Sequence, residues 1–244
     1  MRYLGGKSRL AAKIVGEIRE VCPPPIHVYE PFCGGAAVTR EFAEQGYTVS
    51  ASDLFPGLCE MHRASCAGFR LPSGCTDEMR KAAKGKRDTL SVALRFGLGF
   101  GGNYNSGIAR PPDLYAAQFN RHCERLSKVG PSIAWAECHY ADVHPEVGAV
   151  VYCDPPYAGT TEYAIKNFDH TRFWAWCRDL GTSGVHVFVS EFTGPDDVPV
   201  LFTLDRKVGI DNRGERKKTQ DRTEKLFYLG PVNPADVNVG GRTV

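Results

Sequence analysis

The feature that most limits the fold of this chain is a strand, turn, helix and strand series within residues 26–53. Residues 26–29 have the composition of a short strand, and Gly34-Gly35 opens a helix. Residues 47–52 then form a second strand, which ends at Asp53. Such a βαβ unit places its two strands parallel in one sheet, so the sequence predicts an α/β protein.

Further α/β elements lie before and after this unit. Residues 7–21 carry apolar side chains at helical spacing, and the second half of the chain alternates strand and helix patterns. The later predictions are strands over residues 149–153, 185–190, 198–204 and 225–229 and a helix over residues 169–180. The length of 244 residues suits one domain with a sizeable insertion.

The α/β pattern is lost in residues 58–134, which we interpret as the insertion. This segment holds 12 Lys and Arg against 6 Asp and Glu, whereas the rest holds 18 against 22. We expect a basic helix over residues 77–87, followed by a glycine-rich run over residues 96–105. A local basic excess is typical of a segment that contacts phosphates, although an ordinary solvated face would also be basic.

The nine cysteines form no C-x-x-C pair, which gives little support to a zinc site. Their odd number, and an N-terminal stretch without the apolar core of a signal peptide, favour reduced thiols in the cytoplasm. No stretch is long and apolar enough for a membrane span.

Three motifs carry the chemistry. Glu30-Pro31-Phe32-Cys33-Gly34-Gly35-Ala36 follows the first strand, where glycines let a ligand approach the backbone at a helix start. Asp53 follows the next strand and could accept hydrogen bonds from ribose hydroxyls. Tyr3-Leu4-Gly5-Gly6-Lys7 could hold a carboxylate before the first helix. Tight structural turns are the alternative for both glycine segments.

The third motif, Asp154-Pro155-Pro156-Tyr157, follows a fully apolar strand. Two prolines make the loop rigid and leave its carbonyls free, while Asp154 is an acceptor and Tyr157 offers an aromatic face. These groups could hold an amino group between two acceptors and stack a base. A plain Pro-Pro turn explains the prolines but not the flanking acid and aromatic residue.

Together, in the chain order 3–7, 30–36, Asp53 and 154–157, the motifs resemble the Dam-type DNA adenine methyltransferases of bacteria and phages, the α group or D12 class. The resemblance extends to Tyr140-Ala141-Asp142 and to the basic segment 212–218. It implies a Rossmann-like S-adenosylmethionine-dependent methyltransferase fold, a mixed, mostly parallel sheet with helices on both faces. The catalytic domain would comprise residues 1–57 and 135–244, and the inserted target-recognition region residues 58–134.

The resemblance also implies site residues. The base and its amino group would contact Asp154, Pro155, Pro156 and Tyr157. Double-stranded DNA would contact Tyr104, Asn105, Arg110, Arg213 and Lys217. S-adenosylmethionine would contact Tyr3, Lys7, Glu30, Phe32, Gly34, Asp53, Tyr140 and Asp154.

Segment 104–110 resembles the family's DNA-contacting hairpin, although Pro111-Pro112-Asp113 stands where the family has Phe-Asn-x-Pro. We hypothesise that Tyr104 inserts into the base stack and that Arg110 reads a neighbouring base edge, with guanine favoured. The alternative is that both residues only pack the hairpin against the catalytic domain.

The predicted reaction is transfer of a methyl group to N6 of a flipped-out adenine by a monomer, without a metal or a covalent intermediate. The absence of a Pro-Cys dipeptide argues against methylation of cytosine C5, which needs a thiolate. Methylation of cytosine N4, whose usual motif is Ser-Pro-Pro-Tyr, remains the nearest alternative. An RNA or protein-glutamine methyltransferase and a catalytically inactive DNA-binding relative are the others.

Overall fold

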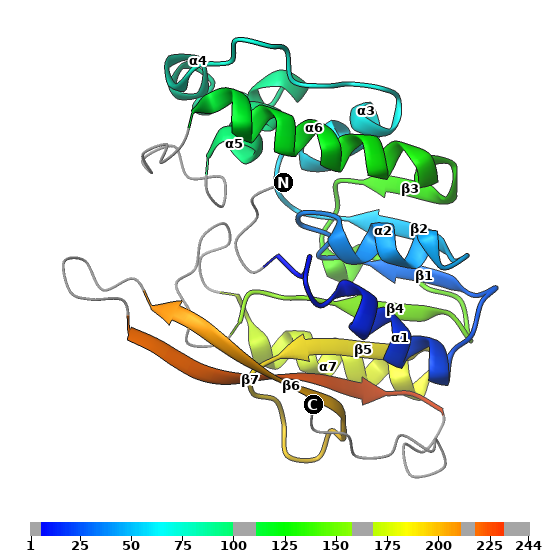
Figure 1. Ribbon diagram of the computed structural model, residues 1–244. Coiled ribbons are helices and arrows are strands. Elements are labelled where there is room, and N and C mark those ends of the chain that lie inside the picture. Colours follow the sequence, from blue (N-terminus) through cyan, green and yellow to red (C-terminus); the bar gives the residue numbers. More distant parts are fainter. Residues whose placement is uncertain (1–5, 100–110, 158–167, 211–217, 232–244) are drawn as a thin grey trace. The chain divides into compact units, whose positions relative to one another are not determined.

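The protein divides into two compact units, seen in the computed structural model of Figure 1. The units comprise residues Met1–Gly16 with Pro24–His144, and residues Glu17–Pro23 with Pro145–Val244. The structure describes residues 6–99, 111–157, 168–210 and 218–231, and the side chains among these except at 204–210 and 218–222. In that part of the chain, no helix has both the length and the hydropathy of a membrane span.

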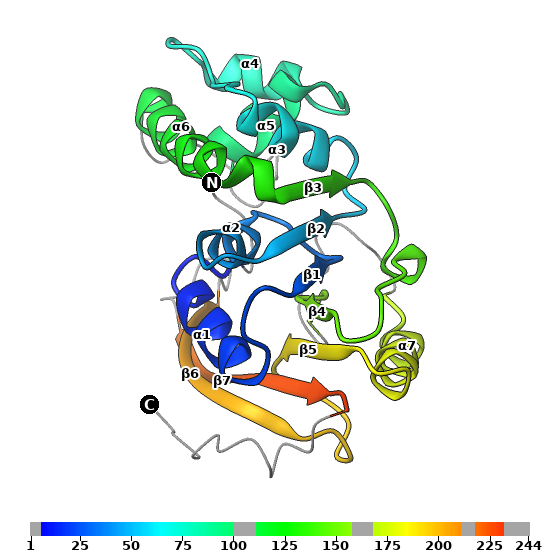
Figure 2. The same ribbon diagram turned by 90° about the vertical axis from the view of Figure 1, so that its right-hand side faces the viewer.

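The first unit contains three parallel strands in the order β3-β2-β1. These are β1 (His27–Glu30), β2 (Thr48–Ser52) and β3 (Ile133–Ala136). Helix α2 (Ala37–Glu44) joins β1 to β2 and packs against β2 (Figure 2). The predicted βαβ unit is therefore confirmed, with its helix beginning three residues after Gly34.

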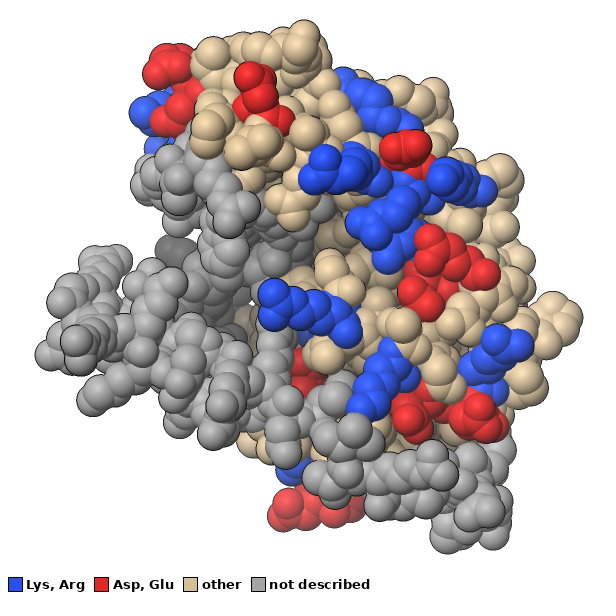
Figure 3. All heavy atoms as spheres, viewed as in Figure 1, with Lys and Arg blue, Asp and Glu red and all other residues tan. Residues whose placement is uncertain are grey.

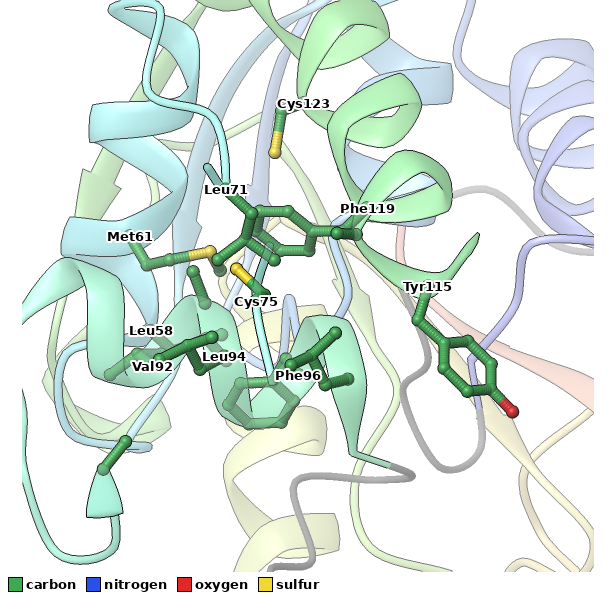
Figure 4. Packing of buried hydrophobic residues seen from close by; sticks show 14 residues of the cluster. Leu58, Met61, Leu71, Cys75, Val92, Leu94, Phe96, Tyr115, Phe119 and Cys123 are labelled. Atoms are coloured by element: carbon green, nitrogen blue, oxygen red, sulfur yellow. The ribbon is translucent and has the colours of Figure 1, made fainter. Parts of the chain in front are cut away.

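Four helices occupy most of residues 58–134: α3 (Leu58–Cys66), α4 (Asp77–Ala82), α5 (Thr89–Leu98) and α6 (Pro112–Val129). Three of them, α3, α5 and α6, share a hydrophobic core (Figure 4). In the close view, the Phe119 ring of α6 lies against Leu71, with Met61 of α3 nearby. The segment thus has a core of its own, while its boundaries as a separate domain stay a prediction.

The expected length of the basic helix in this segment is wrong. The helix begins at Asp77 but ends at Ala82 and not near residue 87, and Gly85 follows with a φ of 79°, which breaks a helix. The glycine-rich run begins within a helix, because Phe96 to Leu98 belong to α5. A Cβ on Gly97 would lie 2.7 Å from Leu71 Cδ1, so this glycine serves close packing.

The second unit has its strands in the order β4-β5-β7-β6. The elements are β4 (Val150–Cys153), α7 (His170–Thr182), β5 (His186–Glu191), β6 (Val200–Ile210) and β7 (Lys218–Leu229). β4 and β5 are parallel, whereas β7 is antiparallel to both β5 and β6. Every β4 side chain is buried, as expected for a continuous apolar run.

Helix α1 (Ala11–Val21) begins four residues later than residue 7, where the apolar pattern starts. The carbonyl of Lys7 instead accepts hydrogen bonds from the amides of Leu10 and Ala11, which makes a turn before the helix. The parallel strands joined by helices, with a reversed strand in the second unit, confirm the prediction of a mixed, mostly parallel Rossmann-like methyltransferase fold.

Candidate active site

The candidate site of the first unit includes the turn that follows β1, residues 33–36, called the glycine turn below. Gly34 has a φ of 45° and Ala36, at the start of α2, a φ of 53°. The Cys33 amide donates to the Ser52 carbonyl at 2.9 Å, which links the turn to the end of β2. Left-handed backbone at Ala36 is unusual for a residue with a Cβ, and such conformations gather at functional sites.

Asp53 holds the glycine turn from the end of β2. Its Oδ2 accepts a hydrogen bond from the Gly34 amide at 2.9 Å, and its Oδ1 accepts one from the Phe55 amide at 2.8 Å. Desolvation raises the pKa of this carboxyl group, the amides of Phe55 and Gly34 lower it, and the charge of Glu137 raises it. The Leu54 amide is a third backbone donor to this carboxylate, which leaves it a further lone pair for a ligand hydroxyl.

Glu30, the last residue of β1, is buried, and its Oε2 accepts a hydrogen bond from Thr39 Oγ1 of α2 at 2.6 Å. Lys7 is also buried, ahead of α1. These two residues are in the first unit with the glycine turn. Their contact with a cofactor stays a prediction.

Two aromatic residues predicted to line the cofactor pocket lie together. The rings of Phe32, next to the glycine turn, and Tyr140 are stacked, with centroids 5.6 Å apart and planes 29° apart. Tyr140 is buried and Phe32 is half-buried. The structure thus brings together four predicted residues, Phe32, Gly34, Asp53 and Tyr140, from segments up to about a hundred residues apart in sequence. A hydrogen bond joins Gly34 to Asp53, and ring stacking joins Phe32 to Tyr140.

A separate group of predicted site residues lies in the second unit: the loop Asp154-Pro155-Pro156-Tyr157, which leaves the buried end of β4. The Tyr157 hydroxyl donates a hydrogen bond to Glu224 Oε1 of β7 at 3.1 Å. Its ring meets the edge of Phe192, with centroids 4.6 Å apart. Desolvation, and the nearby carboxylates led by Asp154, raise the pKa of Tyr157 well above its ordinary value.

The sequence motifs did not indicate three residues that surround Tyr157. Glu224 lies in β7, Glu191 ends β5, and Phe192 follows Glu191. Both glutamates are buried, and Glu191 Oε1 accepts a hydrogen bond from the Phe192 amide at 2.7 Å. The sequence did offer one indication of Glu191, because an acidic residue at the end of a mostly apolar strand needs a polar partner or a function.

Several predicted site residues lie outside the described residues. They are Tyr3 of the N-terminal motif, Tyr104, Asn105 and Arg110 of the predicted DNA-contacting hairpin, and Arg213 and Lys217 of the basic segment.

A comparison with family models matches residues 3–89 to the family described as D12 class N6 adenine-specific DNA methyltransferase. The matched range contains the glycine turn, Asp53 and α3. No curated protein matches the chain.

Solved structures that the chain resembles include methyltransferases. The rRNA methyltransferase aviRa from Streptomyces viridochromogenes is 20% identical, with a TM-score of 0.47, over 96% of this chain and 88% of that one. The 23S rRNA methyltransferase ErmE is 14% identical, with a TM-score of 0.42, over 94% and 72%. SMU.472, a putative methyltransferase complexed with SAH, is 11% identical, with a TM-score of 0.37, over 98% and 53%.

The family match, the strand order and the motifs agree with one another and support a methyltransferase. Over residues 3–89, this chain carries the sequence pattern of the D12 class of N6 adenine-specific DNA methyltransferases, which confirms the resemblance drawn from its motifs.

Proposed function

We propose that this protein transfers a methyl group from S-adenosylmethionine to the N6 amino group of an adenine in double-stranded DNA. The observation that carries the proposal is the loop Asp154-Pro155-Pro156-Tyr157 at the end of a buried strand, with its tyrosine held at both ring and hydroxyl. The D12 match over residues 3–89 supports the choice of adenine and of DNA.

The loop suits an exocyclic amine because it combines acceptors with an aromatic surface. The carboxylate of Asp154 and the carbonyl of Pro155 can each accept a hydrogen bond from the amino group. Two such bonds favour a more tetrahedral nitrogen, whose lone pair is then withdrawn from the ring and available for methylation. Tyr157 supplies a ring for stacking once the base has left the duplex.

S-adenosylmethionine, when bound, supplies a methyl group activated by a sulfonium centre. The residues that would hold it are Phe32, Gly34, Asp53 and Tyr140, together with Lys7, Glu30 and Asp154. The glycine turn fits such a ligand because its left-handed backbone lies at the carboxyl end of β1 and at the start of α2. Asp53 fits because its carboxylate retains an unused lone pair beside that turn.

Double-stranded DNA is the proposed partner, in part because α6 has an exposed row of cations. Arg121, Arg125 and Lys128 are exposed and follow one another at spacings of four and three residues, which places them on one helix face. Figure 3 shows Lys and Arg side chains gathered on the face of the molecule that carries α6. Arg110, Tyr104, Asn105, Arg213 and Lys217 are proposed to add base and phosphate contacts.

The test is an incubation of the purified protein with methyl-labelled S-adenosylmethionine and duplex DNA, followed by nucleoside digestion and mass spectrometry. We expect label in N6-methyladenine and none with Asp154→Ala. Label in N4-methylcytosine would support cytosine as the target instead. Label only in added RNA or protein, or binding of DNA without turnover, would contradict the proposal.

The biological setting follows from the substrate. We propose that the protein acts as a monomer on DNA, without a metal, in the cytoplasm of a bacterial or phage-infected cell. Sequencing DNA from cells that express the protein, with reads sensitive to modified bases, would reveal the target sequence. Methylation without any sequence preference would contradict the proposal of a site-specific enzyme.

A further inference from the structure

His62 lies directly against the glycine turn, although it belongs to none of the motifs. It is in α3, its side chain is fully buried, and its Nε2 is 2.9 Å from the carbonyl oxygen of Gly34. Cys59, three residues earlier on the same face of α3, shares a hydrogen bond with Cys33 of the turn. Helix α3 therefore contacts the turn through two residues, Cys59 and His62, that lie about one helical turn apart.

Burial determines the charge of the His62 ring, and the contact with Gly34 determines which ring nitrogen carries the hydrogen. Burial lowers the pKa of His62 to about 4, so the imidazole is neutral near pH 7. A carbonyl oxygen can only accept, so Nε2 must carry the hydrogen and Nδ1 must be the lone-pair nitrogen. The His62 side chain therefore donates to Gly34, whose amide in turn donates to Asp53.

Packing alone does not account for a histidine at this position. The Nδ1 atom of His62 is buried and has no hydrogen-bond partner among the described residues. An apolar side chain of similar volume would fill the space without leaving a buried polar atom unpaired. What an apolar side chain could not supply is the hydrogen bond to Gly34.

The ring is also held in place from β3. It stacks on Trp135, with centroids 4.8 Å apart and planes 25° apart. The neighbouring Arg63 donates from its Nη2 to the Trp135 carbonyl at 2.6 Å. The position of the Gly34 carbonyl is thus set by a rigid group, since neither the ring nor α3 is free to move independently of the sheet.

We propose that His62 is a positioning residue for the cofactor: its Nε2–H holds the Gly34 carbonyl, and so keeps the glycine turn in the conformation that admits S-adenosylmethionine. This rests on the proposed function for the identity of the ligand. It assigns a role in binding to a helix of the segment 58–134, which the sequence indicated only for DNA recognition. Asp53 holds the amide of Gly34 and His62 holds its carbonyl.

The test compares His62→Leu, which removes the donor, with His62→Gln, whose amide nitrogen can lie near the position of Nε2. Calorimetry with S-adenosylmethionine should give a Kd raised about tenfold for His62→Leu, as expected for one lost hydrogen bond. For His62→Gln it should stay within about threefold. Hydrogen exchange of the Gly34 amide in the free protein should be faster in His62→Leu only.

Phe119→Leu is the matched control, because Phe119 is buried in the same unit and contacts the core of α3, α5 and α6 rather than the turn. It should lower the Tm and leave both the Kd and the Gly34 exchange rate unchanged. If His62→Leu does not fold, His62→Asn replaces it, since its shorter amide cannot reach the Nε2 position.

The outcomes separate the two proposals. A wild-type protein that binds no S-adenosylmethionine would contradict the proposed function, and the exchange rates would still decide whether His62 positions the turn. A wild type that binds, with a donor-lacking variant that matches it in Kd and exchange, would overturn the role of His62. If His62→Gln and His62→Leu lose the same affinity for S-adenosylmethionine, the role of the donated hydrogen bond would be overturned.

Discussion

The hydroxyl of Tyr157 donates a hydrogen bond to Glu224, 67 residues later in the chain, at 3.1 Å. This bond ties the loop after β4 to β7, while the edge contact with Phe192 fixes the ring from the end of β5. The raised pKa of Tyr157 keeps its hydroxyl protonated, so the hydroxyl remains a hydrogen-bond donor at neutral pH. The aromatic ring proposed to stack the base is therefore held in place before any base arrives.

We predict that Tyr157→Phe keeps most of the methyl transfer, whereas Tyr157→Ala loses much more. Phenylalanine retains the stacking surface and loses the bond to Glu224. Alanine removes stacking worth about 1–3 kcal/mol per base. Steady-state kinetics on duplex DNA would measure kcat/KM for both variants. Equal losses would mean that the hydroxyl, and not the ring, matters.

Asp154→Ala should nearly abolish turnover without unfolding the protein, because the lost contact with the amino group strengthens in the transition state. Asp154 is only half-buried, at the exit of β4, so its removal leaves the strand core intact. Single-turnover kinetics would measure the rate, and a melting curve would check the fold. Near-normal turnover in a folded Asp154→Ala protein would exclude the proposed clamp.

Asp53→Ala should weaken the binding of S-adenosylmethionine by about 1.5–3 kcal/mol, the cost of losing a hydrogen bond to a charged group. The change also leaves the amides of Gly34 and Phe55 without their acceptor. Asp53→Asn retains one acceptor oxygen and should lose less. Calorimetry would rank the three proteins, and unchanged affinity in Asp53→Ala would contradict a role of this carboxylate.

His62 should lower the stability of the folded protein as the pH drops from about 6.5 to 4. The pKa of His62 is about 4 in the folded protein, against 6.5 for an ordinary histidine. In this window the unfolded chain binds more protons, so the free energy of unfolding decreases with decreasing pH. A shift of this size corresponds to at most about 3 kcal/mol. Burial lowers the pKa of His122 as well, so it acts in the same direction.

Urea unfolding at pH 7 and pH 4.5 would measure this dependence. His62→Gln, which cannot titrate, should reduce the difference between the two free energies of unfolding. Substituting the exposed His144 by glutamine serves as the control and should leave the difference unchanged. A His62→Gln protein with the full pH dependence would show that other groups are responsible.

Replacing Arg121 and Arg125 by alanine should weaken DNA binding for all sequences alike and reduce the salt dependence. Two phosphate contacts account for a change of about two in the slope of log K against log salt. The control is Arg178→Ala, because Arg178 is already paired with Asp197 at 2.7 Å. Fluorescence anisotropy over a salt series would measure the slope, and an unchanged slope would remove α6 from the DNA-binding surface.

Sequence reasoning failed mainly within residues 58–134, where it missed α3, α5, α6 and β3. The signal for α6 was present, since Pro112 can start a helix and Tyr115, Phe119 and Leu126 have near-helical spacing. The sequence did not indicate α5, because Gly97 is part of a glycine-rich run that is more typical of a loop than of a helix. Gly97 is in fact the small residue that lets α5 approach Leu71 and Phe119, and only the packing of α5 on its neighbours reveals this.

The sequence by itself determined the principal local elements outside residues 58–136 and the chemical character of the proposed site. The periods of apolar residues, the glycine turn and the Asp-Pro-Pro-Tyr loop depend on neighbours a few residues away, so they can be read from a single chain. Only the tertiary structure decided that His62 holds Gly34 and that Glu224 holds Tyr157. The partners in these bonds lie 28 and 67 residues apart, and their meeting depends on how α3 and β7 pack. No local period encodes that packing, because it results from the burial of whole faces of helices and strands.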